Sequence, residues 1–270
     1  MKIVALDSSG LVASVALAED DNLIAEYTVQ YKKTHSQTLL PMLQEICRMV
    51  ELDLDTVDAI AVAAGPGSFT GLRIGSATAK GLVFAMNKPI VPVPTVDGLA
   101  YQMYGARDLV CPIMDARRNQ VYTGIYEFVP DQNGRFGYDM RVIREQCAVS
   151  FDEIAEVLNG LDRSIIFLGD GVPVFHERME QVMRVPYTTA PPHRARQSAA
   201  AVAALGSIYY AQGKAVSGAA HAPEYLRLSQ AEREAGVNGV NGVNLQSKLT
   251  PQSKLTPRGC KASSERGAEQ

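Results

Sequence analysis

MKIVALDSSGLVASVALAEDDNLIAEYTVQY, residues 1–31, alternates three apolar runs with two short polar segments. The runs KIVALDSS, VASVALAE and LIAEYTVQ have strand composition, whereas Ser-Ser-Gly and residues 19–22 have turn composition. The pattern predicts a three-stranded meander at the start of an α/β protein.

After these strands, the apolar residues recur every three to four positions instead of every two. Leu39, Leu43 and Ile46 follow one another at helical spacing and predict a helix over residues 35–50. The apolar strand DAIAVAA, a helix over residues 70–86 and the strand PIVPVP come next, a β-α-β order that favours a parallel crossover.

A second, similar unit begins near residue 106. The strand LVCPIM, the turn DARRNQ, the strands VYTGIYEF and RVIREQCAV, and two β/α segments follow one another in it. We therefore expect two lobes, residues 1–105 and 106–235, each a mixed sheet with helices. The alanine-rich helix at residues 197–211 could pack back against the first lobe.

Composition excludes several classes of protein. The chain has 270 residues, of which 46% are hydrophobic and 20% charged, with a net charge of -3, which is typical of a globular protein and not of a disordered one. The start lacks a secretory pattern and no run is long and apolar enough for a membrane span, so we expect a cytoplasmic protein. An acidic body argues against a direct, tight grip on nucleic acid.

The repeats GVNGVNGVN and QSKLTPQSKLTP dominate residues 236–270. This segment has little apolar surface to bury, and its composition predicts a disordered tail.

GPGSFTGLRIG, residues 65–75, lies between a predicted strand and a predicted helix. Gly65, Gly67 and Ser68 could cradle a phosphate at the helix N-terminus. However, Leu72 stands where a Walker A loop has lysine, and a tight turn with close helix packing explains the motif more simply.

Two aspartates follow predicted strands in corresponding places of the two lobes. Asp7, with Ser8 behind it, ends the first strand, and Asp115 ends the strand LVCPIM. One such hairpin per lobe fits a nucleotide site of the actin-like kind, although each aspartate taken alone is more often a turn residue.

Gly71, Gly75 and Ala79 recur every four residues in the predicted helix 70–86. Interior helix glycines cost about 1 kcal/mol each, so a close contact should compensate for them. That contact is either the chain's own sheet or a partner helix, and the sequence leaves both open. The four histidines are too dispersed for a local metal pair, and His35 suits a cap or an interface better than catalysis.

The sequence resembles the TsaB family of bacterial tRNA threonylcarbamoyladenosine synthesis. The resemblance is carried by MKIVALDSSG, THSQTLLPML, AVAAGPGSFTGLRIGSATAKGL, DARRNQVY and PEYLRLSQAE, and it runs from residue 1 to about residue 234. It implies the two-lobed fold of actin-like ATPases and sugar kinases. The family is paralogous to the catalytic subunit TsaD, but the pair of metal-binding histidines of TsaD has no counterpart here, so no catalytic residue is carried over.

The resemblance further implies a noncatalytic scaffold without a metal. The helices 35–50 and 70–86 would form a bundle with TsaD, or a homodimer when TsaD is lacking, and the ATPase TsaE would complete the complex. The expected interface residues are His35, Leu39, Leu43, Ile46, Gly71, Gly75 and Ala79. A vestigial nucleotide site would use Asp7, Ser8, Gly65, Gly67, Ser68 and Asp115.

No intrinsic cofactor is expected, with ATP or ADP bound only in the assembled complex, and tRNA would be contacted only through that complex. Two alternatives stay open: an independent small-molecule kinase of the actin-like fold and, less favoured, a metallopeptidase-like relative.

Overall fold

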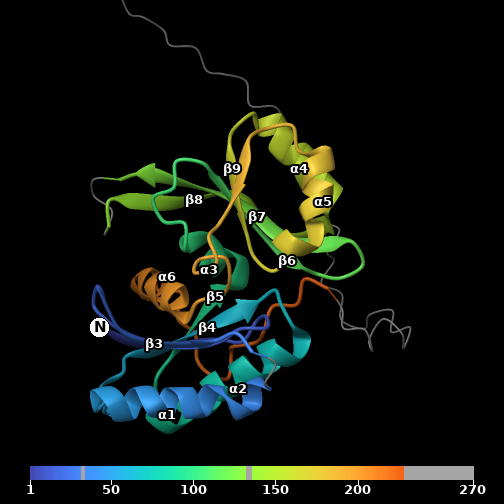
Figure 1. Cartoon of the computed structure of the whole chain (residues 1–270). Coiled ribbons are helices and arrows are strands. Elements are labelled where there is room, and N and C mark those ends of the chain that lie inside the picture. Colours follow the sequence, from blue (N-terminus) through green and yellow to red (C-terminus); the bar gives the residue numbers. More distant parts are fainter. Residues whose placement is uncertain (32–33, 132–135, 228–270) are drawn as a thin grey trace, which may run out of the picture. The chain divides into compact units, whose positions relative to one another are not determined.

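The computed structural model describes residues 1–31, 34–131 and 136–227 (Figure 1). Within it, Met1–Ser229 form one compact unit. The tail predicted at residues 236–270 lies outside the described residues. None of the helices in the described ranges is long and apolar enough to cross a bilayer.

The first sheet confirms the predicted meander and crossover. Its strands run in the order β3-β2-β1-β4-β5, with β1, β2 and β3 antiparallel and β1, β4 and β5 parallel. The bounds are β1 (Lys2–Asp7), β2 (Ala13–Glu19), β3 (Asn22–Val29), β4 (Ala59–Gly65) and β5 (Ile90–Pro94).

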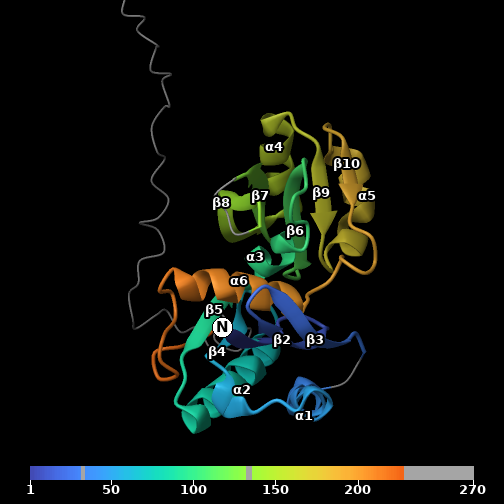
Figure 2. The same cartoon turned by 90° about the vertical axis from the view of Figure 1, so that its left-hand side faces the viewer.

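Helices cover both faces of this sheet. The helices α1 (Leu39–Val50) and α2 (Phe69–Met86) lie on one face, while α6 (Ala199–Ala211) lies on the other (Figures 1 and 2). The alternation along β1 explains this arrangement, because Val4 and Leu6 pack with α1 and α2 whereas Ile3 and Ala5 pack with α6. The helix expected over residues 35–50 begins later, at Leu39, because residues 35–37 form a separate turn of 3-10 helix, η1 (His35–Gln37).

The second sheet repeats the first. Its order is β10-β9-β6-β7-β8, with β6, β7 and β8 antiparallel and β6, β9 and β10 parallel. The bounds are β6 (Leu109–Asp115), β7 (Gln120–Pro130), β8 (Tyr138–Ser150), β9 (Ile165–Leu168) and β10 (Tyr187–Thr189), with α4 (Phe151–Leu161) and α5 (Val172–Val182) on one face. Two sheets with the same order and directions confirm the duplicated, two-lobed α/β fold.

A short helix joins the two halves. The helix α3 (Thr95–Tyr101) is buried at every position and contacts α6, β6 and β7. The apolar cluster around it includes Val93 of the first sheet and Val110 and Phe128 of the second. The core is therefore continuous from one sheet to the other.

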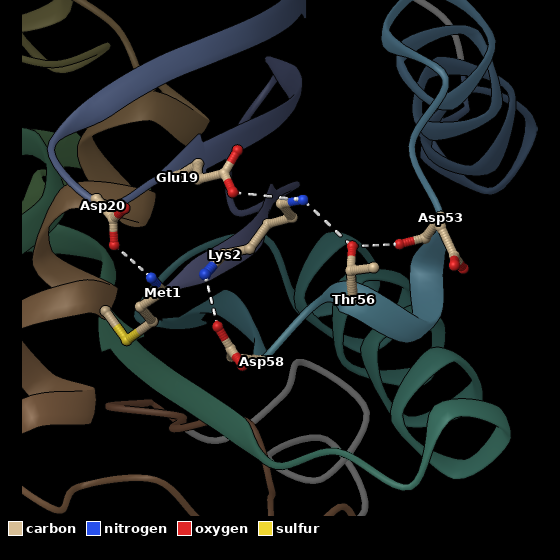
Figure 3. A network of polar contacts seen from close by, with 7 residues as sticks. All are labelled: Met1, Lys2, Glu19, Asp20, Asp53, Thr56 and Asp58. Atoms are coloured by element: carbon tan, nitrogen blue, oxygen red, sulfur yellow. Dashed lines mark hydrogen bonds and ion pairs between the residues drawn. The ribbon is translucent and has the colours of Figure 1, made fainter.

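A polar network holds the N-terminal end of β1, the central strand of the first sheet (Figure 3). The backbone N–H of Lys2 donates to the carboxylate of Asp58 over 2.7 Å, and the Lys2 ammonium lies 3.5 Å from Glu19 and 3.2 Å from the Thr56 hydroxyl. Thr56 in turn donates to the Asp53 carbonyl, 2.6 Å away, in the 3-10 turn η2 (Leu54–Thr56) and its cap. These contacts tie the start of β1 to the segment that leads into β4.

Candidate functional site

A cavity of about 500 Å³ lies between the loops of the first sheet and those of the second. The β1–β2 loop contributes Ser9 and Gly10, and the second half contributes Asp115 and Asp170. The remaining polar lining residues are Gln30, Gly67, Ser68, Arg117, Tyr122, Arg196 and Gln197.

Three of the six residues predicted for a nucleotide site line this cavity: Gly67, Ser68 and Asp115. Asp7 does not. It is buried, and its Oδ1 accepts hydrogen bonds from the backbone N–H of Ser9 at 2.9 Å and from the Ser9 hydroxyl at 2.7 Å. Burial raises the pKa of Asp7 to about 6, while the Ser9 bonds and nearby His35 act in the opposite direction. Ser9 engages the Oδ1 atom of Asp7 within this chain, and a role for Asp7 in a nucleotide site stays a prediction.

Ser8 and Gly65 are also structural in this chain. The Ser8 hydroxyl donates to the carbonyl of Gly71, 2.9 Å away, and so anchors the first turn of α2. Gly65 has a φ of +122°, and a Cβ there would overlap the Glu224 carbonyl. These two residues hold loops together beneath the cavity wall instead of facing a ligand.

The opposite wall carries charges of both signs. The Asp115 carboxylate accepts from the backbone N–H of Arg117 at 2.7 Å and from its guanidinium at 3.0 Å. The backbone N–H of Asp115 donates to Asp170 over 3.1 Å, and burial raises the pKa of Asp170. Arg196 lies close enough to stabilise the ionised form of Asp170. The cavity can thus hold a polar ligand, but no single charge dominates it.

Sequence reasoning missed most of the lining residues, among them Arg117, Asp170, Arg196 and Gln197. The sequence did carry a signal for Asp170, since it follows a predicted strand just as Asp7 and Asp115 do. Gln197 carried no such signal, and its amide group nevertheless lies so close to Gly10 that a Cβ on this glycine would be 2.7 Å from Nε2.

Most of the expected interface residues face the inside of the chain. Leu39 is only 1% exposed, and Leu43, Ile46 and Ala79 are equally part of the core beneath the first sheet. Their helical spacing is real, but it marks the stripe that packs on this chain's own strands. Their burial in this chain argues against a direct contact with a partner, and a role at an interface stays a prediction for these four residues.

The glycines of α2 are explained in the same way. A Cβ on Gly71 would overlap the Ser8 carbonyl oxygen, and one on Gly75 would lie 2.5 Å from the Ser8 hydroxyl. Both glycines therefore allow α2 to approach the β1–β2 loop of the same chain, not a partner helix. The His35 ring is half-buried, and its Nε2 lies 2.9 Å from the carbonyl of Gly10, to which it donates.

The outer faces of α1 and α2 carry a different set of residues. Leu40 is 51% exposed and Phe84 is 91% exposed. Ala77 and Gly81 lie four residues apart on the same outer side of α2, and nothing comes within 4 Å of a Cβ built on Gly81. We call Leu40, Ala77, Gly81 and Phe84 the outer helix face. All four residues are exposed, whereas the residues of α1 and α2 that pack on the sheet are buried.

No group of three or more histidine, cysteine, aspartate or glutamate side chains suited to a metal ion occurs among the described residues. The free cysteines in the same part of the chain, Cys47, Cys111 and Cys147, have raised pKa values because of burial, which makes them poor nucleophiles.

Comparisons with known proteins agree with this architecture. The family model of TsaD, tRNA N6-adenosine threonylcarbamoyltransferase, matches residues 22–235. The tRNA threonylcarbamoyladenosine biosynthesis protein TsaB of Bacillus subtilis is 34% identical over 242 residues, which cover 86% of this chain and 96% of the relative. The chain belongs to the TsaB family. TsaB of Haemophilus influenzae is 34% identical over 166 residues, covering 59% of this chain and 69% of the relative.

A solved structure of the same family confirms the fold. YeaZ from Pseudomonas aeruginosa superimposes with a TM-score of 0.70 at 28% identity, covering 83% of this chain and 99% of that one. Two of the motifs that carried the resemblance to TsaB proteins contribute to the surfaces described above. THSQTLLPML forms η1 and the start of α1, whereas DARRNQVY forms the β6–β7 turn at the cavity.

Proposed function

We propose that this chain is a noncatalytic, cytoplasmic subunit of the complex that installs a threonylcarbamoyl group on N6 of adenosine 37 in tRNAs reading ANN codons. In this proposal it binds the catalytic subunit TsaD, and the ATPase TsaE completes the complex. Membership of the TsaB family supports the pathway. The outer helix face is the observation that carries the partner-binding role.

The chemistry of that face suits a helical partner. Ala77 and Gly81 present almost no side chain, so the backbone of a second helix can approach α2 closely at these positions. Phe84, three residues after Gly81 on α2, and Leu40 on α1 add exposed apolar surface, which gains free energy when a partner removes it from water. Two helices on each side would give a four-helix contact.

The same surface would serve a homodimer. An exposed apolar face that is vacant when TsaD is lacking can meet its own copy through a two-fold axis, since such an interface is self-complementary. Homodimer and heterodimer would then exclude each other, and the TsaD concentration would set the balance.

The interlobe cavity has a secondary place in this proposal. Asp7 is bonded within its own loop, so we propose no intrinsic cofactor, with ATP or ADP bound only in the assembled complex. The chain would reach tRNA only through its partners and would have no contact with a membrane. The cavity is also what favours the alternative of a small-molecule kinase, in which Asp115 would be the available carboxylate.

The decisive experiment compares two exposed helical glycines. Gly81→Leu places a large side chain in the outer helix face, and Gly160→Leu places the same side chain on α4, where a Cβ likewise meets nothing within 4 Å. We expect the first to weaken binding to TsaD by tenfold or more, as overpacking of about 1.4 kcal/mol does, and the second to leave it unchanged.

Formation of threonylcarbamoyladenosine in tRNA, assayed with TsaD and TsaE and with or without this chain, should follow the same order. Equal binding by both variants would contradict the assignment of the surface. The assignment would also be contradicted if omission of the chain abolished the modification but neither variant reduced it.

A further inference from the structure

The carboxylate of Asp97 joins three elements of the fold. Asp97 belongs to α3 and is 7% exposed. Its Oδ1 accepts a hydrogen bond from the hydroxyl of Tyr126 on β7, 2.7 Å away. Its Oδ2 accepts one from the hydroxyl of Tyr209 on α6, 2.8 Å away. One buried carboxylate therefore connects the second sheet to a helix that packs on the first.

The two tyrosines are held in place by their own surroundings. Tyr126 is completely buried, and Gly124 on the same strand makes room for it, because a Cβ there would lie 2.7 Å from the Tyr126 hydroxyl. The ammonium of Lys214 lies 3.9 Å from the centre of the Tyr209 ring. Neither hydroxyl can move far from Asp97 while the surrounding elements stay packed.

The charges favour the same arrangement. Burial and the neighbouring carboxylate raise the pKa of both tyrosines, so both hydroxyls stay protonated and donate. Burial raises the pKa of Asp97, as does nearby Glu145, whereas the two tyrosine bonds and Lys214 lower it. The two phenol donors thus offset much of what burial costs this carboxylate.

We propose that Asp97, Tyr126 and Tyr209 form a lock that couples the two halves of the fold, so that the second sheet cannot open away from α6 while the first half stays folded. Separation at this point would break one of the two hydrogen bonds, whichever half α3 follows, and leave the buried carboxylate without one of its donors.

The absence of tryptophan from the sequence provides a clean test. Tyr27→Trp on β3 reports on the first sheet, and Tyr187→Trp on β10 reports on the second. Each reporter is placed singly in the full chain, and unfolding in urea is followed by fluorescence. With the lock intact, both reporters should give the same midpoint.

Combining each reporter with the double substitution Tyr126→Phe and Tyr209→Phe removes both donors and keeps both rings. The two midpoints should then separate by about 0.5 M urea or more. The loss of a hydrogen bond to a charged group lowers the free energy of unfolding by more than about 0.5 M urea does in a protein with an ordinary m-value. Tyr210→Phe with Tyr225→Phe is the matched control, since it also removes two hydroxyls, neither of which is bonded to Asp97.

The outcomes discriminate between a lock and ordinary stabilisation. If the urea midpoints of both reporters fall by the same amount in the double variant, the hydroxyls stabilise the chain without coupling its halves, and the proposal is overturned. It is equally overturned if the two reporters already give different midpoints with the lock intact, or if the control variant separates the two midpoints by as much as the double variant does.

Discussion

Gly75 of α2 lies against the hydroxyl of Ser8, so closely that a Cβ on the glycine would be 2.5 Å from the Ser8 oxygen. Gly75→Ala should therefore destabilise the isolated chain by about 1 to 3 kcal/mol through overpacking. Urea unfolding measures the change. Gly81→Ala on the same helix is the control and should raise stability by about 0.5 to 1 kcal/mol, because its Cβ meets nothing and alanine favours the helix. Equal effects at both positions would contradict this account of the α2 glycines.

Adjacent leucines at the start of α1 should respond in opposite ways. Leu39→Asp buries a charge in the core and should prevent stable folding, because Leu39 is 1% exposed. Leu40→Asp should leave the melting temperature within a few degrees of the parent and reduce affinity for TsaD. Calorimetry and a binding titration on both variants check the pair, and a folded Leu39→Asp protein would show that the helix is rotated from the position described.

Stability should fall with rising pH because of Asp7. Its pKa is raised from 3.8 unfolded to about 6 folded, so the folded state binds the extra proton between these values. This contribution is fully present below 3.8 and is lost as the pH rises to about 6. Asp7→Asn removes the dependence, and the variant should gain up to about 3 kcal/mol relative to the parent between pH 4 and pH 8. Parallel pH profiles for the two proteins would rule Asp7 out as the cause.

The isolated chain should not turn over ATP at a useful rate. The phosphate lysine is missing, and Asp7 is bonded to Ser9. Phosphate release below the range of about 1 per second that is ordinary for enzymes is the expected result. Turnover in that range, lost in Asp115→Asn, would favour the kinase alternative instead.

How far the sequence predicts this molecule depends on the range of the contacts. The meander and the β-α-β unit are local, and their periods identify them correctly. The strand β10 has only three residues, Tyr187–Thr189, too few to show a period. The sequence leaves the contact of the α2 glycines open because small residues occupy two stripes, one through Gly75 that faces Ser8 and one through Gly81 that faces outward.

Spacing alone does not tell which of those stripes meets the sheet. Likewise, the bond between Asp97 and Tyr126 joins residues 29 positions apart, and nothing local marks either one. Most residues of the cavity were not predicted for the same reason; Arg196 and Gln197, for example, reach it from just before α6.

Because the two sheets have the same strand order, the helices of one repeat can be compared directly with those of the other. The helices α4 and α5 occupy in the second repeat the places that α1 and α2 occupy in the first. On their outer side, Arg178 and Asp152 form an ion pair at 2.7 Å, and His176 and Glu180 are exposed beside it. Both helix pairs carry an exposed ion pair, since Arg48 and Glu45 form one on α1, and both expose some apolar side chains. What the second repeat lacks is a side chain like Phe84, which is 91% exposed, whereas the most exposed large apolar residue of α4 and α5 is Val174 at 59%. The exposure of Phe84 is therefore a property that this architecture does not require.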